Sequence, residues 1–199
     1  MTKDFYEAIK NRRSIYAIGK EKVVPVSRVE DVVKQAVKYT PYAFNATSGR
    51  IVLLFDENHE ELWSMTKETL REIVPLDNFA ATEERINSFA SGYGTVLFFE
   101  DQEVVAGLQE KMELYKDNFP IWSEQASGML QYVVWTSLEL EGLGASLQHY
   151  NPLIDDQVKQ KWGIPSSWKL RAQMPFGNPE SPAGEKEYQS LEERVKVFK

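Results

Sequence analysis

Apolar side chains recur every three or four positions in several stretches, which is typical of helices with one buried face. The clearest stretch follows Pro25 and places four valines on one face: Val29, Val32, Val33 and Val37. Ser27 and Glu30 have the spacing of a capping box, so we predict a helix over residues 28–39. The same spacing predicts further helices over residues 4–13, 58–72, 82–90 and 155–162.

Three other stretches have the character of strands. Residues 51–55 and 95–100 are short, continuous apolar runs rich in β-branched and aromatic side chains, and residues 168–177 alternate between apolar and polar. In all, the pattern indicates roughly six helices and four strands in irregular order. It therefore predicts an α+β fold in a single domain over residues 1–199, without the regular alternation of a doubly wound fold.

The longest element predicted is a helix that includes residues 128–140, which are apolar on nearly every face. A helix with this composition is expected to be buried on all sides. Pro120 suits its first turn, and Gly142 or Gly144 suits its end, because proline favours the start of a helix and glycine the position just beyond it.

The composition is that of an ordinary globular protein, with 42% hydrophobic and 27% charged residues among 199. A chain of this length buries about 70% of its unfolded surface, enough for a core without disulfides or metal. The formal net charge of −7 argues against nucleic acid or an anionic membrane as the main partner. Residues 1–13 lack the pattern of a signal peptide, and no window reaches about 18 uninterrupted apolar residues, so we expect a soluble cytoplasmic protein.

The sequence lacks the motifs of the common hydrolases and nucleotide-binding folds, namely GxSxG, GxGxxG, GxxxxGKS/T and HExxH. It contains no cysteine, which excludes thiolate metal sites, redox pairs and a cysteine nucleophile. Its two histidines, His59 and His149, lack the spaced partners of a zinc site. Any redox chemistry must therefore come from a bound cofactor.

Three residues at the end of the first predicted helix are candidates for phosphate binding. Arg12, Arg13 and Ser14 present two cations and a hydroxyl over three positions, which is the chemistry that a phosphate monoester needs. The alternative is a solvated helix end whose arginines complement the helix dipole.

Two loops contain further polar candidates. Asn45, in the loop over residues 40–49, offers both a donor and an acceptor, as required to read an amide or imide edge. Ser48 lies in the same loop, where both residues are also typical of turns. His149 follows the long helix and could be either a core residue or a cofactor contact.

Taken in order, these pieces resemble the nitroreductase family over essentially the whole chain. The segments that carry the resemblance are EAIKNRRSIY, TPYAFNATSGRIVLLF, the GLGAS turn after the long helix, WGIP about 20 residues further on, and MPFGNP. The resemblance implies a homodimer with a central mixed, mainly antiparallel sheet flanked by helices. It also implies an FMN at each of two sites in the dimer interface, reduced by NADH or NADPH in a ping-pong cycle. Small aromatic electron acceptors such as nitroaromatics and quinones would be the substrates.

The resemblance also assigns roles to residues, while the flavin N5 itself carries the chemistry and no catalytic side chain is required. Arg12, Arg13 and Ser14 would hold the ribityl phosphate, with Lys186 and Arg194 as further cations. The loop would contact the flavin ring through Pro41, Tyr42, Ala43, Asn45 and Ser48. The segment close to N5 would consist of Gln148, His149 and Tyr150.

The chain departs from the usual family pattern at several positions. Tyr16 stands where a basic residue is common, Tyr150 where a small residue is common, and Thr47, Ser48 and Gly49 where the family often has Gln-Pro-Trp. These changes, with the strings QHYNP and LEERVKVF, look like the subgroup that contains the fungal fatty-acid-repression and bacterial copper-induced nitroreductases. That resemblance implies a role in stress response or detoxification.

Two rival functions and one alternative for the interface stay open at this point. The altered loop and Tyr150 would also suit a non-catalytic, flavin-binding regulator on the same fold, and the net charge would suit an acidic interaction protein without cofactor. The chain has five Trp, nine Tyr and ten Phe, and aromatic residues are enriched at subunit contacts. Trp122 and Trp135 are candidates for such a contact, although plain core packing would explain them equally well.

Overall fold

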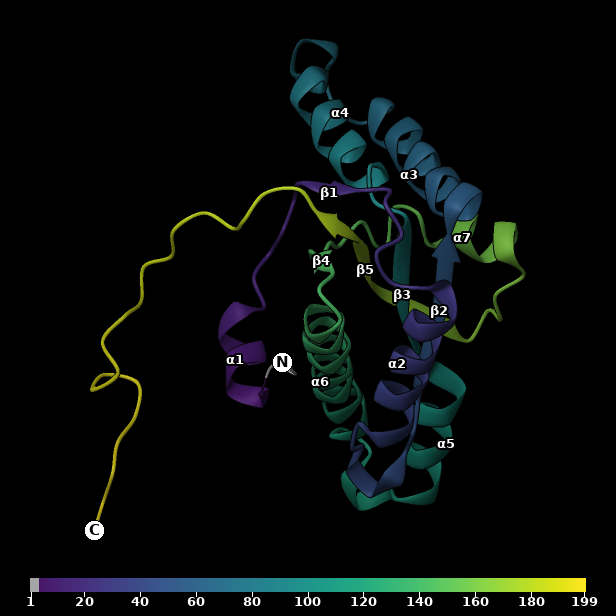
Figure 1. Cartoon of the computed structure of the whole chain (residues 1–199). Coiled ribbons are helices and arrows are strands. Elements are labelled where there is room, and N and C mark those ends of the chain that lie inside the picture. Colours follow the sequence, from purple (N-terminus) through teal and green to yellow (C-terminus); the bar gives the residue numbers. More distant parts are fainter. Residues whose placement is uncertain (1–3) are drawn as a thin grey trace.

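A five-stranded sheet forms the centre of the computed structural model, which describes residues 4–199 (Figure 1). The strands run in the order β1-β5-β3-β2, β4 pairs with β5, and every strand pair is antiparallel. The first three residues of the segment for which we expect no signal peptide lie outside the described part of the chain. The strands are β1 (Ile18–Gly19), β2 (Gly49–Phe55), β3 (Gly94–Asp101), β4 (Gly144–Ala145) and β5 (Trp168–Pro179).

Seven α-helices lie within residues 4–199, one more than the sequence predicts. The additional helix is α5, which presents little periodicity because Val105 is its only buried residue. The seven helices are α1 (Phe5–Asn11), α2 (Val26–Tyr39), α3 (Asp56–Arg71), α4 (Leu76–Ala90), α5 (Gln102–Lys111), α6 (Phe119–Leu140) and α7 (Asp155–Trp162). Two short 3-10 turns are η1 (Ala43–Asn45) and η2 (Glu113–Tyr115).

The predicted capping box of α2 is wrong. The helix begins two residues earlier than predicted, with Pro25 at its N-cap, so Ser27 lies inside the first turn and makes no capping bond. A capping box is present instead at α1, where the Asp4 side chain accepts from the Glu7 N–H and the Glu7 side chain accepts from the Asp4 N–H. The rigid φ of proline fixes the start of α2 without a side-chain acceptor.

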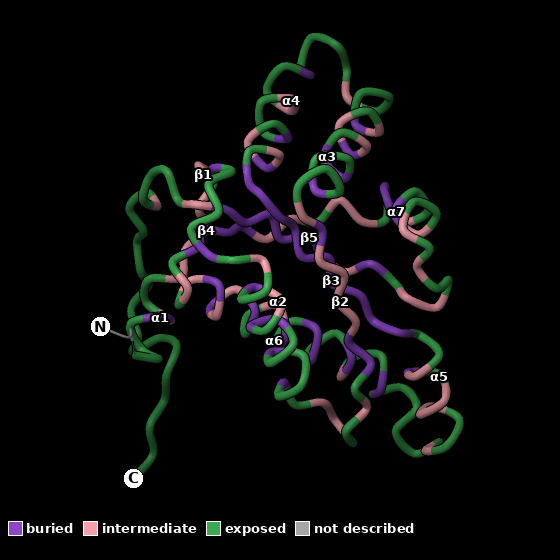
Figure 2. Tube along the Cα trace, turned by 45° about the vertical axis from the view of Figure 1, so that its right-hand side comes forward, coloured by how far each residue is buried: buried purple, intermediate pink, exposed green. Residues whose placement is uncertain are grey.

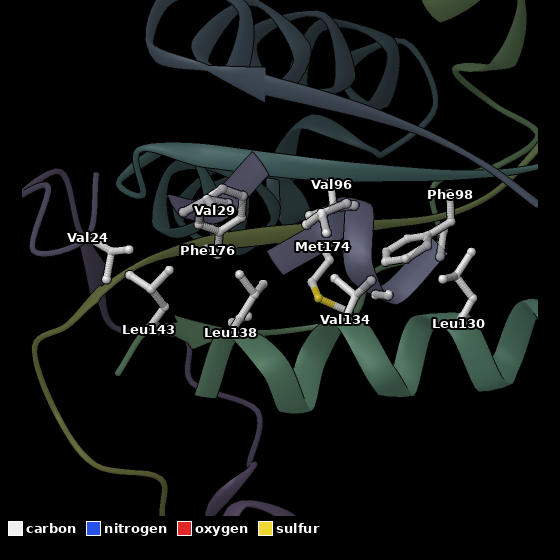
Figure 3. Packing of buried hydrophobic residues seen from close by; sticks show 14 of the residues in the cluster. Val24, Val29, Val96, Phe98, Leu130, Val134, Leu138, Leu143, Met174 and Phe176 are labelled. Carbon is white, nitrogen blue, oxygen red and sulfur yellow. The ribbon is translucent and has the colours of Figure 1, made fainter. Parts of the chain in front are cut away.

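Helices cover both faces of the sheet, which explains why β3 reads as a continuous apolar run (Figure 2). Successive side chains of a strand point to opposite faces. Val96 and Phe98 therefore pack with α2 and α6, whereas Leu97 and Phe99 pack with α3, α4 and α7. Figure 3 shows the first of these two cores, in which side chains of α6 meet those of β3 and β5.

The long helix α6 ends as predicted but is not buried on all sides of the single chain. Pro120 lies in its first turn, and Gly142 follows its end with φ +83°, a conformation that glycine adopts without strain. One face, with Leu130, Val134 and Leu138, is packed in the core. The opposite face leaves apolar residues 36–55% exposed: Ile121, Met129, Tyr132, Val133 and Leu140.

The C-terminal residues 180–199 leave the end of β5 as a tail that runs away from the body of the molecule (Figure 1). Nearly all of its side chains are exposed. Among residues 4–199, no helix combines the length and the apolar character that a membrane crossing requires.

Candidate functional site

The segment after α1, which contains the residues predicted to bind phosphate, forms one wall of a hollow. Beyond the helix, the Arg12 backbone takes φ −59° and ψ 105°, which turns the chain into an extended segment. Ser14 pairs with Ala145 of β4 in a parallel bridge, and the Ile15 N–H donates to the Ala145 carbonyl at 3.0 Å. The hollow has a volume of about 550 Å³, and its other wall is the start of the tail, residues 181–186.

Arg13 and Lys186 face this hollow from its two walls. The Arg13 Nη2 donates to the Gly184 carbonyl at 2.8 Å, which ties the tail to the segment after α1. Glu185 also lines the hollow, but no carboxylate of residues 4–199 forms an ion pair with Arg13 or Lys186. Neither charge is therefore neutralised by a carboxylate of the described residues, although the Lys186 Nζ lies 5.2 Å from the centroid of the Tyr188 ring.

Arg12 is held more tightly than Arg13. Its guanidinium carbon lies 4.3 Å from the centroid of the Trp135 ring and 5.8 Å from that of Tyr132, both on α6. Such stacking fixes the plane of a guanidinium. Its Nε is buried without a hydrogen-bond partner, which costs free energy unless a further acceptor binds there.

The segment predicted to pass near the flavin N5 begins directly after β4. Gln148 and Gln173 exchange backbone hydrogen bonds of 2.7 and 2.9 Å, and the Gln173 Oε1 accepts from the Tyr150 N–H at 2.7 Å. Ser14 pairs with Ala145, three residues before Gln148, so the chain reaches this segment directly after its contact with one wall of the hollow. The fold thus brings together two groups of predicted site residues that are more than a hundred positions apart in the sequence.

The side chains of His149 and Tyr150 point to different surroundings. His149 is exposed, whereas the Tyr150 ring packs edge-on against Trp63 at 5.9 Å and Phe89 at 6.4 Å. Burial raises the pKa of the Tyr150 phenol above its usual value. Tyr150 is therefore committed to the core between β5 and α3.

The predicted flavin loop lies elsewhere, at the N-terminal end of α6. Phe44 has its ring near those of Phe119 and Trp122, with centroid distances of 5.6 and 5.8 Å. Tyr42, Ala43 and Ser48 line a small enclosed cavity, and Pro41 lines a separate hollow between α2 and α6. A methyl group at Gly49 would overlap the Tyr42 hydroxyl, which explains why no larger residue stands at the end of the altered triplet.

The loop has an unusual backbone. Phe44, Asn45 and Thr47 have φ values of 52°, 54° and 47°, in the left-handed region that favours glycine. Thr47 is β-branched, for which this conformation is a clear outlier. Strain of this kind persists only where surrounding contacts enforce it, and it concentrates at functional sites.

One chain does not bring the loop and the cations together. The loop packs at Trp122, near the start of α6, and Arg12 stacks on Trp135, thirteen residues further along the same helix. A rise of 1.5 Å per residue separates these two points by about 20 Å. Of the predicted cations, Lys186 lies at the hollow, whereas Arg194 lies further along the exposed tail.

Sequence reasoning missed two buried polar residues, Gln173 on β5 and Glu100 on β3, both with 0% of their surface exposed. For Glu100 the available signal was its place at the end of an apolar run, because a polar group is buried at a cost unless it has a partner, whereas Gln173 stands at a polar position of an alternating strand and gives no such signal. No group of three or more His, Asp or Glu side chains in residues 4–199 could hold a metal ion.

Comparison with known proteins finds a family match that covers most of the chain. The model of the family described as "Nitroreductase family" matches residues 9–178. The nitroreductase HBN1 of Saccharomyces cerevisiae is 32% identical over 98% of this chain and 96% of its own length. The yeast nitroreductase FRM2 is 32% identical over 94% of each chain.

Solved structures agree with the sequence matches. The nitroreductase CinD from Lactococcus lactis, solved in complex with chloramphenicol, superposes with a TM-score of 0.91 at 44% identity, covering 98% of this chain and all of CinD. CinD has also been solved with 4-nitrophenol. A protein from Desulfovibrio desulfuricans, solved in complex with FMN, is 16% identical with a TM-score of 0.69 and shares the fold. The predicted α+β fold with a mainly antiparallel sheet is confirmed, as is the resemblance to the subgroup of these yeast and Lactococcus proteins.

Proposed function

The chain belongs to the nitroreductase family, and from this premise we propose that it is a cytoplasmic, FMN-dependent NAD(P)H oxidoreductase that acts as a homodimer of single-domain subunits. The observation that carries the proposal is the hollow beside β4. There, Arg12, Arg13 and Lys186 lie beside Ser14 and form no ion pair with any carboxylate in the part of the chain that the structure describes, which is the chemistry of a phosphate site.

The residues present fit the phosphate end of FMN. The buried Arg12 Nε lacks a hydrogen-bond partner, and a phosphate oxygen would supply one. The Arg13 guanidinium uses one Nη2 bond on Gly184 and keeps further donors for the same anion. Lys186 adds a compact charge from the opposite wall, and Ser14 adds a hydroxyl.

FMN supplies hydride transfer through its N5 when it is bound, and the protein supplies binding and orientation. The backbone of Gln148 is fixed by its pairing with Gln173, so the segment that leads to His149 is held on β5. Asn45 is the loop residue suited to the polar edge of a flavin ring, because its amide both donates and accepts. We infer no acid or base among the side chains.

Two separated half-sites support the homodimer. In a dimer with two-fold symmetry, both subunits contribute the same surface to the interface. The loop of one subunit can therefore lie beside the cations of the other. The exposed apolar face of α6, which carries both half-sites at its ends, is the surface that such a partner would cover. Trp122 and Trp135 would then lie at or near the interface.

The tail offers a second surface for a partner. Its apolar side chains are 59–93% exposed in the single chain: Tyr188, Leu191, Val195, Val197 and Phe198. Apolar side chains in such number are typical of a segment that packs on another molecule. Arg194 lies between Leu191 and Val195, so packing of the tail on a partner would decide whether its charge reaches a phosphate.

We propose small, flat electron acceptors as substrates, namely nitroaromatics and quinones, in a ping-pong cycle driven by NADH or NADPH and serving detoxification or stress response. The ligands of CinD, chloramphenicol and 4-nitrophenol, support this class, as does the half-exposed Phe44 ring in the loop. One argument for the rival function, a flavin-binding regulator, was that Tyr150 would stand beside the flavin N5. This argument is weakened, because the Tyr150 ring is packed against Trp63 and Phe89.

Absorption spectroscopy tests the cofactor and the phosphate site together. The purified protein should be yellow, release FMN on denaturation and bleach on anaerobic addition of NADH or NADPH. Arg12→Ala with Arg13→Ala should weaken FMN binding by at least about tenfold, because two charge-assisted bonds to phosphate are lost. Arg71→Ala, at an exposed arginine of α3, is the matched control and should bind FMN as the wild type does. A wild-type protein that stays colourless with excess FMN would refute the function, and one that binds FMN without turnover of nitroaromatics or quinones would be the regulator.

Light scattering after size-exclusion chromatography tests the dimer. The wild type should have twice the chain mass of 22.9 kDa. Met129→Glu with Val133→Glu should shift it to the monomer and abolish tight FMN binding, because two charges in the α6 face would lose their hydration in the interface. Leu76→Glu, at a position that is 83% exposed on α4, should leave the dimer intact. A wild-type monomer that binds FMN tightly would contradict the arrangement.

A further inference from the structure

Glu100 is a buried carboxyl group behind the loop over residues 41–48. It lies next to the end of β3, pairs with Gly49 of β2 and has 0% of its surface exposed. Its Oε2 lies 2.5 Å from the Ser48 Oγ and 3.1 Å from the Ser123 Oγ on α6. One carboxyl oxygen therefore connects the end of the loop with the helix below it.

Glu100 forms no ion pair with any cation among residues 4–199. Two arginines of the neighbouring strands pair with other carboxylates, Arg50 with Asp101 and Arg171 with Glu124. Burial raises the pKa of Glu100 above its usual value, against the smaller opposite effect of the two hydroxyls. Its Oε1 has no hydrogen-bond partner, which costs far less for a carbonyl oxygen of a neutral acid than for a buried anion. The geometry thus favours an unionised carboxyl.

The strained loop depends on anchors at its C-terminal end. The Ser48 carbonyl accepts from the Asp101 N–H at 2.9 Å, and the Arg50 Nη1 donates to the Thr47 carbonyl at 2.7 Å. Both of these anchors hold the backbone. The Ser48–Glu100 bond is an anchor that acts through a side chain of the loop, one residue after the left-handed Thr47 and three after Asn45.

We propose that Glu100 is a positioning residue for flavin binding, holding the loop through Ser48 in the left-handed conformation that presents Asn45. This proposal rests on the function proposed above. Glu100 does not touch the cofactor; it selects the loop conformation that the cofactor meets. Ser123 of α6 makes a second, longer hydrogen bond to the same carboxyl oxygen, and the bond to Ser48 is the one that reaches the loop.

The experiment compares three variants with the wild type by hydrogen exchange of the loop amides without FMN and by FMN titration. Glu100→Ala removes the anchor, so loop amides should exchange about tenfold faster and the FMN Kd should rise by about tenfold. Glu100→Gln keeps the size, the neutrality and the bonds to Ser48 and Ser123, and it should restore both values to within about twofold. Ser123→Ala is the control: it removes the bond to α6 and leaves the bond to the loop, so it should change either value by less than about threefold.

A double-mutant cycle shows whether Glu100 acts through Ser48. Ser48→Ala combined with Glu100→Ala should raise the FMN Kd no more than the larger single change, because both variants break the same bond. Additive effects, or unchanged loop exchange in Glu100→Ala, would overturn the proposal. So would a Glu100→Gln protein as defective as Glu100→Ala, since the neutral carboxyl would then not be the working form. A wild type that never binds FMN would refute the proposed function, while the exchange data would still decide whether Glu100 holds the loop.

Discussion

Trp63→Ala is expected to lower the free energy of unfolding by about 4 kcal/mol, because a fully buried indole leaves a large cavity when it is truncated. The ring lies 4.9 Å from that of Phe89 and 5.9 Å from that of Tyr150, measured between centroids. Its Nε1 also donates to the Thr95 Oγ1 at 2.9 Å. Chemical denaturation followed by circular dichroism measures the change.

Trp63→Phe separates packing from hydrogen bonding. Phenylalanine fills part of the space but cannot donate to Thr95, so we expect a loss of about 2 kcal/mol. Because Tyr150 packs on this ring and its N–H is held by Gln173, the alanine variant should also loosen the segment beside the hollow. A Trp63→Ala protein within about 1 kcal/mol of the wild type would show that the core on this side of the sheet relaxes to fill the space.

The second large effect is acid destabilisation through His59. This imidazole is fully buried, its Nδ1 lies 2.8 Å from the Thr95 Oγ1, and burial lowers its pKa to about 4. The unfolded chain, with an ordinary pKa of about 6.5, takes up the proton first as the pH falls. The free energy of unfolding should therefore fall between about pH 6.5 and pH 4, by about 3 kcal/mol from this group.

His59→Asn isolates that contribution. Asparagine places a polar atom near the position of Nδ1 and does not titrate, so the variant should be less stable at neutral pH but lose less stability on acidification. The difference between the two proteins is the quantity to measure, because Glu100 acts in the opposite direction: its raised pKa makes the folded state bind a proton first and gain stability as the pH falls. Parallel curves for the wild type and His59→Asn over this range would contradict the assignment.

The pattern of apolar residues predicted the main strands and six of the seven helices, because burial against a sheet leaves a strong periodic signal. The same pattern did not predict α5. This helix buries one valine, which is too weak a periodic signal to distinguish a helix from a loop. The pattern also misplaced the cap of α2, because two residues at capping-box spacing are common and the backbone decides which of them is used.

The candidate site was predicted in pieces rather than as a whole. Arg12, Arg13 and Ser14 are adjacent, so their shared chemistry is visible in the sequence, whereas Lys186 joins them only because the tail passes beside Arg13, which donates to the Gly184 carbonyl. The role of Glu100 could not be predicted, because its partners Ser48 and Ser123 lie 52 and 23 positions away along the chain.

The sequence by itself determined the class of fold, the order of the main elements, the absence of thiol chemistry and the family. These properties depend on residue type and local spacing. The tertiary structure alone decided that Ala145 of β4, three residues before Gln148, lies beside Ser14, that the Tyr150 ring belongs to the core, and that α6 holds the loop and the cations about 20 Å apart. These relations join residues distant in the chain, and only the packing of helices on both faces of one sheet fixes them.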